Sequence, residues 1–179
     1  MEFSTQYEGQ VARITELFRA TFSAAEGVTE GAVIGGLVQN LLTETSPEDI
    51  HVFTALKDGA LVAGVIITRL AYAHDARKVF LLSPMAVASD SQGQGIGQAL
   101  LQHVLDKLRE AGVDILMTYG DPRFYGKLGF TVVGEEDARP PLPLSQPHGW
   151  LGQSLQGSGL TPLQGPSTCV AALNNQHFW

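Results

Sequence analysis

The clearest periodic pattern in the chain is a stripe of apolar residues that begins at Ile96 and ends at Leu108. These residues recur at the spacing of one helix face, while the polar residues between them fall on the opposite face. Gly112 follows the last apolar position, where a left-handed helix cap costs least. A largely apolar run at 78–88 precedes the stripe. The pattern therefore predicts a buried strand, a turn and an amphipathic helix, in that order.

Weaker patterns predict the elements on the N-terminal side of this segment. Two amphipathic helices are separated by Gly27, and Thr29 is the expected N-cap of the second helix. Two β-rich runs flank Asp58-Gly59, and this dipeptide is a strong signal for a hairpin. The expected elements are a strand at 2–7, helices at 8–22 and 29–43, strands at 51–56, 61–70 and 78–88, and a loop at 71–77.

A glycine pair, Gly35-Gly36, lies inside the second of these helices. Each glycine in a helix interior costs about 1 kcal/mol relative to alanine. The pair therefore marks either a weak point in the helix, or a bend or close approach to a neighbouring element.

The C-terminal third alternates short regular elements with irregular chain. Asp121-Pro122 is typical of the N-cap and first residue of a helix. Six prolines interrupt residues 135–179, which we expect to form an irregular extension with strands that complete the sheet. The expected strands are at 114–119, 130–133, 150–155 and 168–173.

Composition indicates a globular protein of one domain, residues 1–179, with 44% hydrophobic and 16% charged residues. The net charge of −7 and the scattered basic residues argue against nucleic-acid binding, and an acidic protein is compatible with a cationic, amine-bearing substrate. One cysteine excludes an internal disulfide, and no Cys/His spacing predicts a metal site. No signal peptide or apolar run long enough to span a membrane is evident, so we expect a cytoplasmic protein that does not bind membranes.

The turn between the buried strand and the striped helix contains Gly93, Gly95 and Gly97. The first amides of a helix lack internal partners, and the helix dipole favours an anion there. We therefore interpret this turn as a pyrophosphate cradle, with a turn that is merely tight as the alternative. No Gly-Lys-Ser/Thr follows, which excludes a Walker loop, and Gln98 stands where a dinucleotide fingerprint needs glycine or alanine.

Two ordered motifs within residues 79–133 resemble those of one family. The first is Gln-x-x-Gly-x-Gly at Gln92, Gly95 and Gly97, and the second is Tyr-x-x-x-Gly-Phe from Tyr125 to Phe130. Together they resemble the GNAT superfamily of acetyl-CoA-dependent N-acetyltransferases. The resemblance implies an α/β (α+β) fold with a mixed, mostly antiparallel twisted sheet, splayed at the central strand and flanked by helices on both faces.

The resemblance also implies a set of site residues, with residues 79–133 as the CoA-binding and catalytic core. Pro84 would lie at the bulge of the splayed strand, and Tyr125 would protonate the leaving thiolate, or else only pack on CoA. The residues expected to bind acetyl-CoA are Met85, Ala86, Val87, Gln92, Gly93, Gln94, Gly95, Ile96, Gly97, Gln98 and Tyr125. No Arg or Lys is evident in the turn, and Gly120-Asp121-Pro122 stands where some family members carry asparagine.

The general base is not determined by the sequence. Asp121 is the first candidate for a catalytic carboxylate, although it also serves as a helix cap. Water relay of the amine's proton is the alternative to a direct base. The other candidates are Glu44, His51, His74 and Asp75.

The expected function is transfer of an acetyl group from acetyl-CoA to a primary amine, directly and in a ternary complex. A non-catalytic acyl-CoA sensor on the same fold is the alternative, because fold does not fix function. The amine is not identified by any motif. A homodimer is possible from the resemblance.

Overall fold

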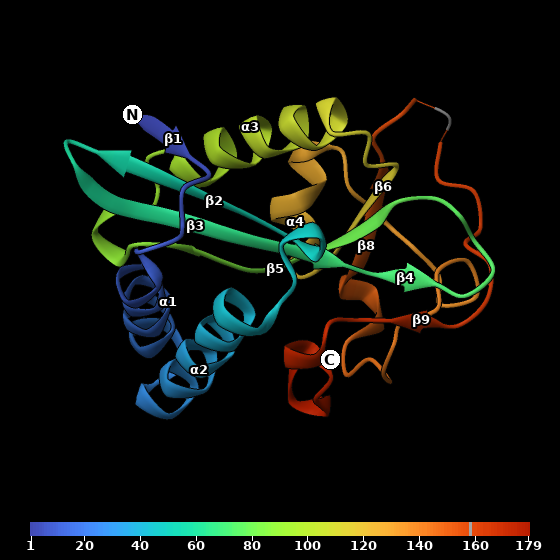
Figure 1. Ribbon diagram of the computed structural model, residues 1–179, viewed down its shortest axis with the longest axis horizontal. Coiled ribbons are helices and arrows are strands. Elements are labelled where there is room, and N and C mark those ends of the chain that lie inside the picture. Colours follow the sequence, from blue (N-terminus) through green and yellow to red (C-terminus); the bar gives the residue numbers. More distant parts are fainter. Residues whose placement is uncertain (158) are drawn as a thin grey trace. The chain divides into compact units, whose positions relative to one another are not determined.

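The structure, a computed structural model, describes residues 1–157 and 159–179 (Figure 1). The helices are α1 (Val11–Glu26), α2 (Val28–Glu44), α3 (Ile96–Glu110) and α4 (Pro122–Tyr125). The strands are β1 (Glu2–Ser4), β2 (Ile50–Lys57), β3 (Ala60–Arg69), β4 (Ala71–Tyr72), β5 (Val79–Val87), β6 (Ile115–Tyr119), β7 (Thr131–Val132), β8 (Trp150–Ser154) and β9 (Ser167–Thr168).

The described strands form a seven-stranded sheet in the order β1-β2-β3-β5-β6-β8-β7, and β4 and β9 form a separate two-stranded sheet. β5 and β6 are parallel, whereas β1–β2, β6–β8 and β7–β8 are antiparallel. This mixed sheet with its helices is the α/β (α+β) fold class predicted from the sequence.

The chain divides into two compact units. The first unit comprises Met1–Ile67 and Pro84–Val104, and the second comprises Thr68–Ser83 and Leu105–Trp179. Strands β3 and β5 contribute residues to both units. The expectation of one domain spanning 1–179 stays a prediction.

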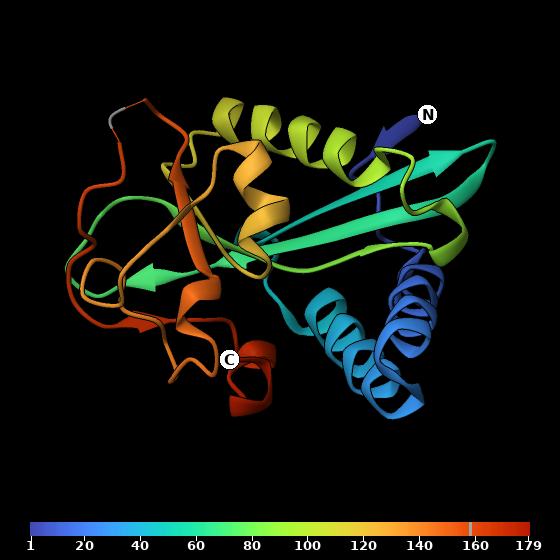
Figure 2. The ribbon, with the colours of Figure 1, turned by 180° about the vertical axis from the view of Figure 1, so that it is seen from behind.

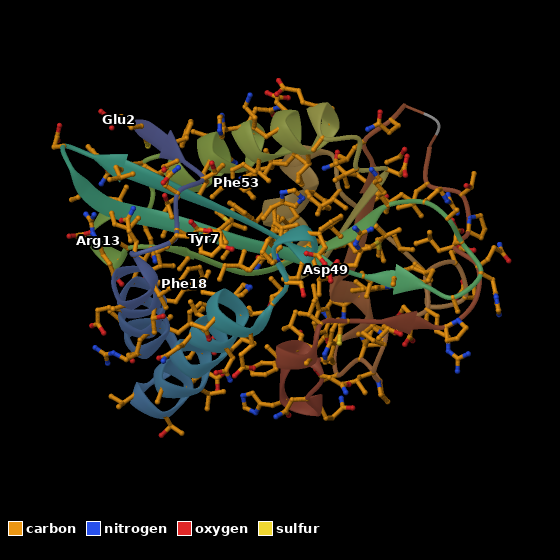
Figure 3. The ribbon with its side chains drawn as sticks, viewed as in Figure 1. Glu2, Tyr7, Arg13, Phe18, Asp49 and Phe53 are labelled. Carbon is orange, nitrogen blue, oxygen red and sulfur yellow. The ribbon has the colours of Figure 1, made fainter. Side chains whose placement is uncertain are left out.

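In the first unit, α1 and α2 lie on one side of β2 and β3, and α3 lies on the other (Figures 1 and 2). Phe18 of α1 approaches β3 closely, since its Cε2 lies 3.1 Å from the position that a Cβ at Gly64 would take. On the other side, the His103 ring of α3 stacks on Phe3 at 4.7 Å and meets Phe53 edge-on at 6.1 Å. Figure 3 labels Phe18 and Phe53. Within this unit, helices therefore cover both faces, as predicted.

Helices α1 and α2 pack so closely that glycine is required between them. A Cβ at Gly31 would lie 2.7 Å from the Arg19 carbonyl oxygen, and a Cβ at Gly35 would lie 3.2 Å from Arg19 Cβ. Gly36 has no neighbour within 4 Å of such a Cβ. The close-approach interpretation of Gly35-Gly36 is therefore right for Gly35 only.

The bounds of both helices in this region differ from the prediction. The first helix begins at Val11 rather than residue 8 and runs on to Glu26. Gly27, at φ 99°, is both the C-cap of α1 and the N-cap of α2, so Thr29 is not the cap. The glycine permits a reversal so abrupt that no polar cap residue is needed to separate the helices.

In the second unit, β8 pairs with both β6 and β7, and its first residue, Trp150, is fully buried. The Trp150 indole donates a hydrogen bond to the Ala138 carbonyl oxygen at 2.8 Å. This strand is therefore the sheet-completing element expected at 150–155.

The expected loop at 71–77 and the expected strand at 168–173 are both partly wrong. Ala71 and Tyr72 form β4, which pairs with Ser167 and Thr168 of β9. After Thr168 the chain turns into a 3-10 helix at Ala171–Leu173. The pairing partners are far apart in sequence, so local patterns carry no sign of this ladder.

Candidate functional site

The glycine turn of the first unit joins β5 to α3 in a left-handed conformation. Gly93 and Gly95 have φ angles of 73° and 77°, which L side chains rarely adopt. No atom lies within 4 Å of a Cβ built on either residue, so both positions border open space. The first helical hydrogen bond runs from the Ala99 amide to the Gly95 oxygen at 3.0 Å. The amides of residues 96–98 therefore precede the helical ladder, as a backbone anion site requires.

The two glutamines of the turn use their side chains to hold its shape. Gln92 Nε2 donates to the Val87 oxygen at 2.9 Å, which ties the turn to the end of β5. Gln94 Nε2 donates to the Asp90 oxygen at 3.2 Å. Both glutamines are exposed, as is Gln98 at the start of α3. Their contacts indicate a turn that is already ordered by its own side chains.

Ile96 and Gly97 differ from the other predicted cradle residues because both are buried. Ile96 is 3% exposed and is the first residue of the apolar stripe. Its side chain therefore anchors α3 in the core, so only its backbone N–H is available to bind an anion.

Lys57 is a cation beside this turn that sequence reasoning missed. It is the last residue of β2, and its Nζ donates a hydrogen bond to Gln94 Oε1 at 2.9 Å. The two residues are 37 positions apart in sequence. The only local signal was the position of Lys57 next to the Asp58-Gly59 hairpin turn, which does not reveal what the hairpin approaches.

The ladder between β5 and β6 ends at Leu82, two residues before Pro84. The ladder with β6 runs from Val79↔Ile115 to Leu82↔Thr118. Pro84 lies beyond this ladder, where its missing N–H breaks no hydrogen bond with β6. The predicted acetyl-CoA residues Met85 and Val87 are half-buried, whereas Ala86 between them is 3% exposed.

Tyr125, the predicted acid, is the last residue of α4 in the second unit. Its ring meets Phe124 and Phe130 edge-on at centroid distances of 5.0 and 5.5 Å. Burial raises the pKa of the Tyr125 phenol, and a hydrogen bond with Thr118 offsets part of that rise. The phenol is therefore protonated at neutral pH, as an acid must be.

Gly120 sets the position of the Tyr125 ring. A Cβ at Gly120 would collide with the Tyr125 ring, so a residue with a side chain would displace the phenol.

Asp121, the predicted catalytic carboxylate, caps α4. Its Oδ1 accepts a hydrogen bond from the Arg123 amide at 2.9 Å, and its carboxylate meets the Arg123 guanidinium at 3.3 Å. The hydrogen bonds from the Arg123 backbone and side chain lower the pKa of Asp121. A lowered pKa weakens a general base at neutral pH but preserves an anion that attracts an ammonium group.

A polar cavity of about 440 Å³ lies beside Asp121 within the second unit. Its wall is closed by a hydrogen bond from the Gly120 amide to the Gly149 oxygen at 2.9 Å. Tyr119 Oη accepts a hydrogen bond from the Gln146 amide at 2.6 Å, which also ties the segment 145–149 to the end of β6. The cavity is lined by Tyr119, Gly120, Asp121, Pro122, Arg123, Ser145, Gln146, His148 and Gly149. The segment 145–149 was missed because its residues match no motif.

The other candidate bases lie in different places. Glu44, at the end of α2, and His51, on β2, belong to the first unit. His74 and Asp75 belong to the second unit. Asp75 is engaged by the Arg77 guanidinium at 2.8 Å, and that hydrogen bond lowers the pKa of Asp75 to about 2. Asp75 is therefore a structural anion.

The described residues, 1–157 and 159–179, contain neither a metal-binding cluster nor a membrane-spanning helix. Residues 1–157 and 159–179 contain no group of three or more His, Cys, Asp or Glu side chains that is arranged to hold a metal ion. In that same part of the chain, none of the helices has the length and apolar character needed to cross a bilayer.

Comparison with known proteins identifies similar sequences. A family model described as an acetyltransferase (GNAT) domain matches residues 48–132. The uncharacterized N-acetyltransferase YjhQ of Escherichia coli K12 is 28% identical over 139 residues, which cover 75% of this chain and 76% of YjhQ. The uncharacterized N-acetyltransferase YhbS of the same strain is 36% identical over 58 residues, or 32% of this chain and 35% of YhbS.

Solved structures share the fold. The crystal structure of YhbS from Escherichia coli in complex with CoA superposes with a TM-score of 0.79 at 21% identity, covering 98% of this chain and 92% of that one. A GNAT family acetyltransferase from Brucella melitensis in complex with acetyl-CoA gives a TM-score of 0.70 at 20% identity, covering 97% of each chain.

Proposed function

We propose that the chain, which matches a GNAT acetyltransferase domain over residues 48–132, transfers an acetyl group from acetyl-CoA to a primary amine. Transfer is direct, in a complex of both substrates with the protein. The amine nitrogen forms a bond to the acetyl carbon, the carbon–sulfur bond breaks, and CoA leaves as a thiol. The amine loses one proton and the departing sulfur gains one.

The observation that carries the proposal is the ordered glycine turn at the start of α3. Gly93 and Gly95 expose backbone at positions where no other atom lies near. The amides of Ile96, Gly97 and Gln98 precede the helical ladder, and such amides bind phosphate together with the helix dipole. The turn binds the diphosphate of CoA, and Met85, Ala86 and Val87 pair with its pantetheine arm.

Tyr125 protonates the sulfur as the thioester breaks. A positioned acid contributes about 10²–10⁴-fold to such a step. Supporting this role, burial keeps the phenol protonated at neutral pH, and the Gly120 contact restricts its ring.

The acceptor amine enters the polar cavity beside Asp121. At neutral pH the Asp121 carboxylate is charged, because the hydrogen bonds from Arg123 lower its pKa. It therefore holds the incoming ammonium group, and water carries the proton away. The cavity volume of about 440 Å³ suits a small polar amine or the end of a longer one.

Calorimetric titration of CoA into the wild-type protein and into Gly95→Glu tests the cradle. A glutamate at a position with φ 77° strains the turn and places a carboxylate against the phosphates, so binding is expected to disappear. Gly36→Glu, on exposed α2 surface with no neighbour within 4 Å, is the matched control. Unchanged CoA affinity in Gly95→Glu would show that the turn is not the phosphate site.

A non-catalytic acyl-CoA sensor is the competing function on this fold. Release of free thiol from acetyl-CoA across a panel of amines separates the two functions. The enzyme requires amine-dependent release that is lost in Tyr125→Phe, whereas a sensor binds acetyl-CoA without amine-dependent release.

A further inference from the structure

Lys57 places an ammonium group at the turn that precedes α3. The residue is exposed, and its Nζ lies 2.9 Å from Gln94 Oε1. Gln94 is itself fixed, because its Nε2 donates to the Asp90 oxygen at 3.2 Å. A single glutamine side chain thus joins the β2–β3 hairpin to the glycine turn and holds the lysine beside the turn.

Lys57 differs from the other cations of the first unit in that its partner lies in the glycine turn. The Lys and Arg residues among the described residues of this unit are Arg13, Arg19 and Lys57. Arg19 forms an ion pair with Glu16, and Arg13 donates to the Gly59 oxygen at 2.8 Å, at the far side of the hairpin turn. Lys57 instead donates to Gln94 Oε1 of the glycine turn, which, like the acceptor of Arg13, is a neutral amide oxygen. A phosphate oxygen attracts the Lys57 ammonium more strongly than an amide oxygen does, because the phosphate carries a formal negative charge and the two groups form an ion pair.

Acidic residues near the turn make this charge more important. Asp58 follows Lys57 in the chain, and Asp90, whose Oδ1 accepts from Ser91 Oγ at 2.9 Å, precedes the glycines. Without Lys57, an incoming phosphate would meet these carboxylates with only backbone amides to offset them.

We propose that Lys57 binds a phosphate of the CoA donor at the turn before α3 and makes this site selective for the phosphorylated donor. The inference rests on the proposed function. The ammonium exchanges its hydrogen bond with Gln94 Oε1 for one with a phosphate oxygen, either of the diphosphate or of the 3′-phosphate. Because Gln94 already holds the side chain in place, little ordering is needed on binding.

The test is calorimetric titration of CoA and 3′-dephospho-CoA into the wild-type protein, Lys57→Met, Lys57→Arg and Lys107→Met. Methionine keeps the length of the side chain and removes the charge. Lys107→Met is the matched control, because Lys107 lies in the last turn of α3, away from the glycine turn at its start, and is paired with Glu110. Thermal unfolding followed by circular dichroism checks that each variant is folded, which the exposure of Lys57 favours.

Loss of a hydrogen bond to a charged group predicts that Lys57→Met raises the Kd for CoA about tenfold at low salt. Lys57→Arg and Lys107→Met are expected to stay within about twofold of wild type, and the salt dependence of CoA binding is expected to be shallower in Lys57→Met. If Lys57→Met lowers the affinity for CoA but not for dephospho-CoA, Lys57 binds the 3′-phosphate. If it occurs equally with both ligands, Lys57 binds the diphosphate.

CoA affinity in Lys57→Met within twofold of wild type would overturn the inference while leaving the proposed function intact. Failure of the wild-type protein to bind CoA would overturn the proposed function and the inference together, and the wild-type titration alone reveals that case.

Discussion

A Cβ atom at Gly120 would lie 2.7 Å from Cε2 of Tyr125. The ring of the proposed acid therefore rests directly on the backbone at the end of β6. The backbone thus sets where the phenol hydroxyl lies, and residue 120 controls the position of Tyr125 without taking part in the chemistry.

Gly120→Ala is expected to lower kcat by about 10²-fold, because an added methyl group pushes the Tyr125 ring aside and a shift of about 1 Å is enough for such a loss. The KM for acetyl-CoA is expected to change little. Thiol release with a competent amine measures both values. Gly126→Ala is the matched control, since a Cβ there meets no atom within 4 Å and φ is −59°. Equal losses in both variants would point to general disturbance of α4.

Tyr125→Phe is expected to reduce turnover by about 10²–10⁴-fold while acetyl-CoA still binds, because only the proton donor is removed. Tyr7→Phe, which removes a phenol hydroxyl in the first unit, is expected to retain activity (Figure 3). Binding by calorimetry and turnover by thiol release are measured on the same samples. Full turnover in Tyr125→Phe would mean that the ring only packs on CoA.

The pH profile of wild-type turnover gives a separate check on Tyr125. The acid works only when protonated, and burial raises the pKa of the phenol above its ordinary value. Loss of activity through ionisation of Tyr125 is therefore expected only above about pH 10, where exposed tyrosines ionise. If activity instead falls near pH 8, and still does so in Tyr125→Phe, the group that ionises there is not Tyr125.

Substitutions in α2 are expected to change stability with opposite signs. Gly31→Ala places a Cβ 2.7 Å from the Arg19 carbonyl oxygen and is expected to destabilise the protein by about 1–3 kcal/mol, because two packed helices must move apart. Gly36→Ala meets no neighbour and is expected to stabilise the protein by about 0.5–1 kcal/mol through helix propensity. Urea unfolding measures both. Similar effects at the two positions would contradict the close packing of α1 on α2.

The pair Asp75–Arg77 is expected to make stability depend on acid pH. The Arg77 hydrogen bond lowers the folded-state pKa of Asp75 to about 2, below the ordinary value of 3.8. The resulting stabilisation, about 1–2 kcal/mol, is present above pH 4 and is lost as the pH falls toward 2. Asp75→Asn is expected to show a deficit at pH 7 that disappears near pH 2, as measured by urea unfolding. Asp58→Asn, in an exposed turn, is the control.

The elements that the sequence predicted well are those with a strong local signal. The apolar stripe from Ile96 to Leu108 marked α3, and Asp58-Gly59 marked the β2–β3 hairpin. Asp121-Pro122 marked the cap and first residue of α4. Helix periodicity and turn chemistry are both encoded within a few residues, so they can be recognised from the sequence without knowledge of the fold.

The features that the sequence did not reveal depend on partners far along the chain. β4 exists because Tyr72 pairs with Ser167, and no alternation within two residues can indicate this. Lys57 reaches the glycine turn only because the hairpin brings it to Gln94. The wall of the polar cavity formed by 145–149 likewise has no pattern of its own. The glycine turn could therefore be singled out from the sequence, whereas a long side chain that reaches it from another element could not.

Gly27 ends α1 and begins α2, so residues 11–44 contain two helices that pack against each other with no other segment between them. Contacts so near in sequence form quickly, whereas the β6–β8 ladder joins residues up to Ser154 and closes slowly. During synthesis the residues of the helix pair are made before any residue of β5, β6 or β8. The protein is therefore expected to begin folding from its N-terminal helices, with the sheet assembling on them afterwards.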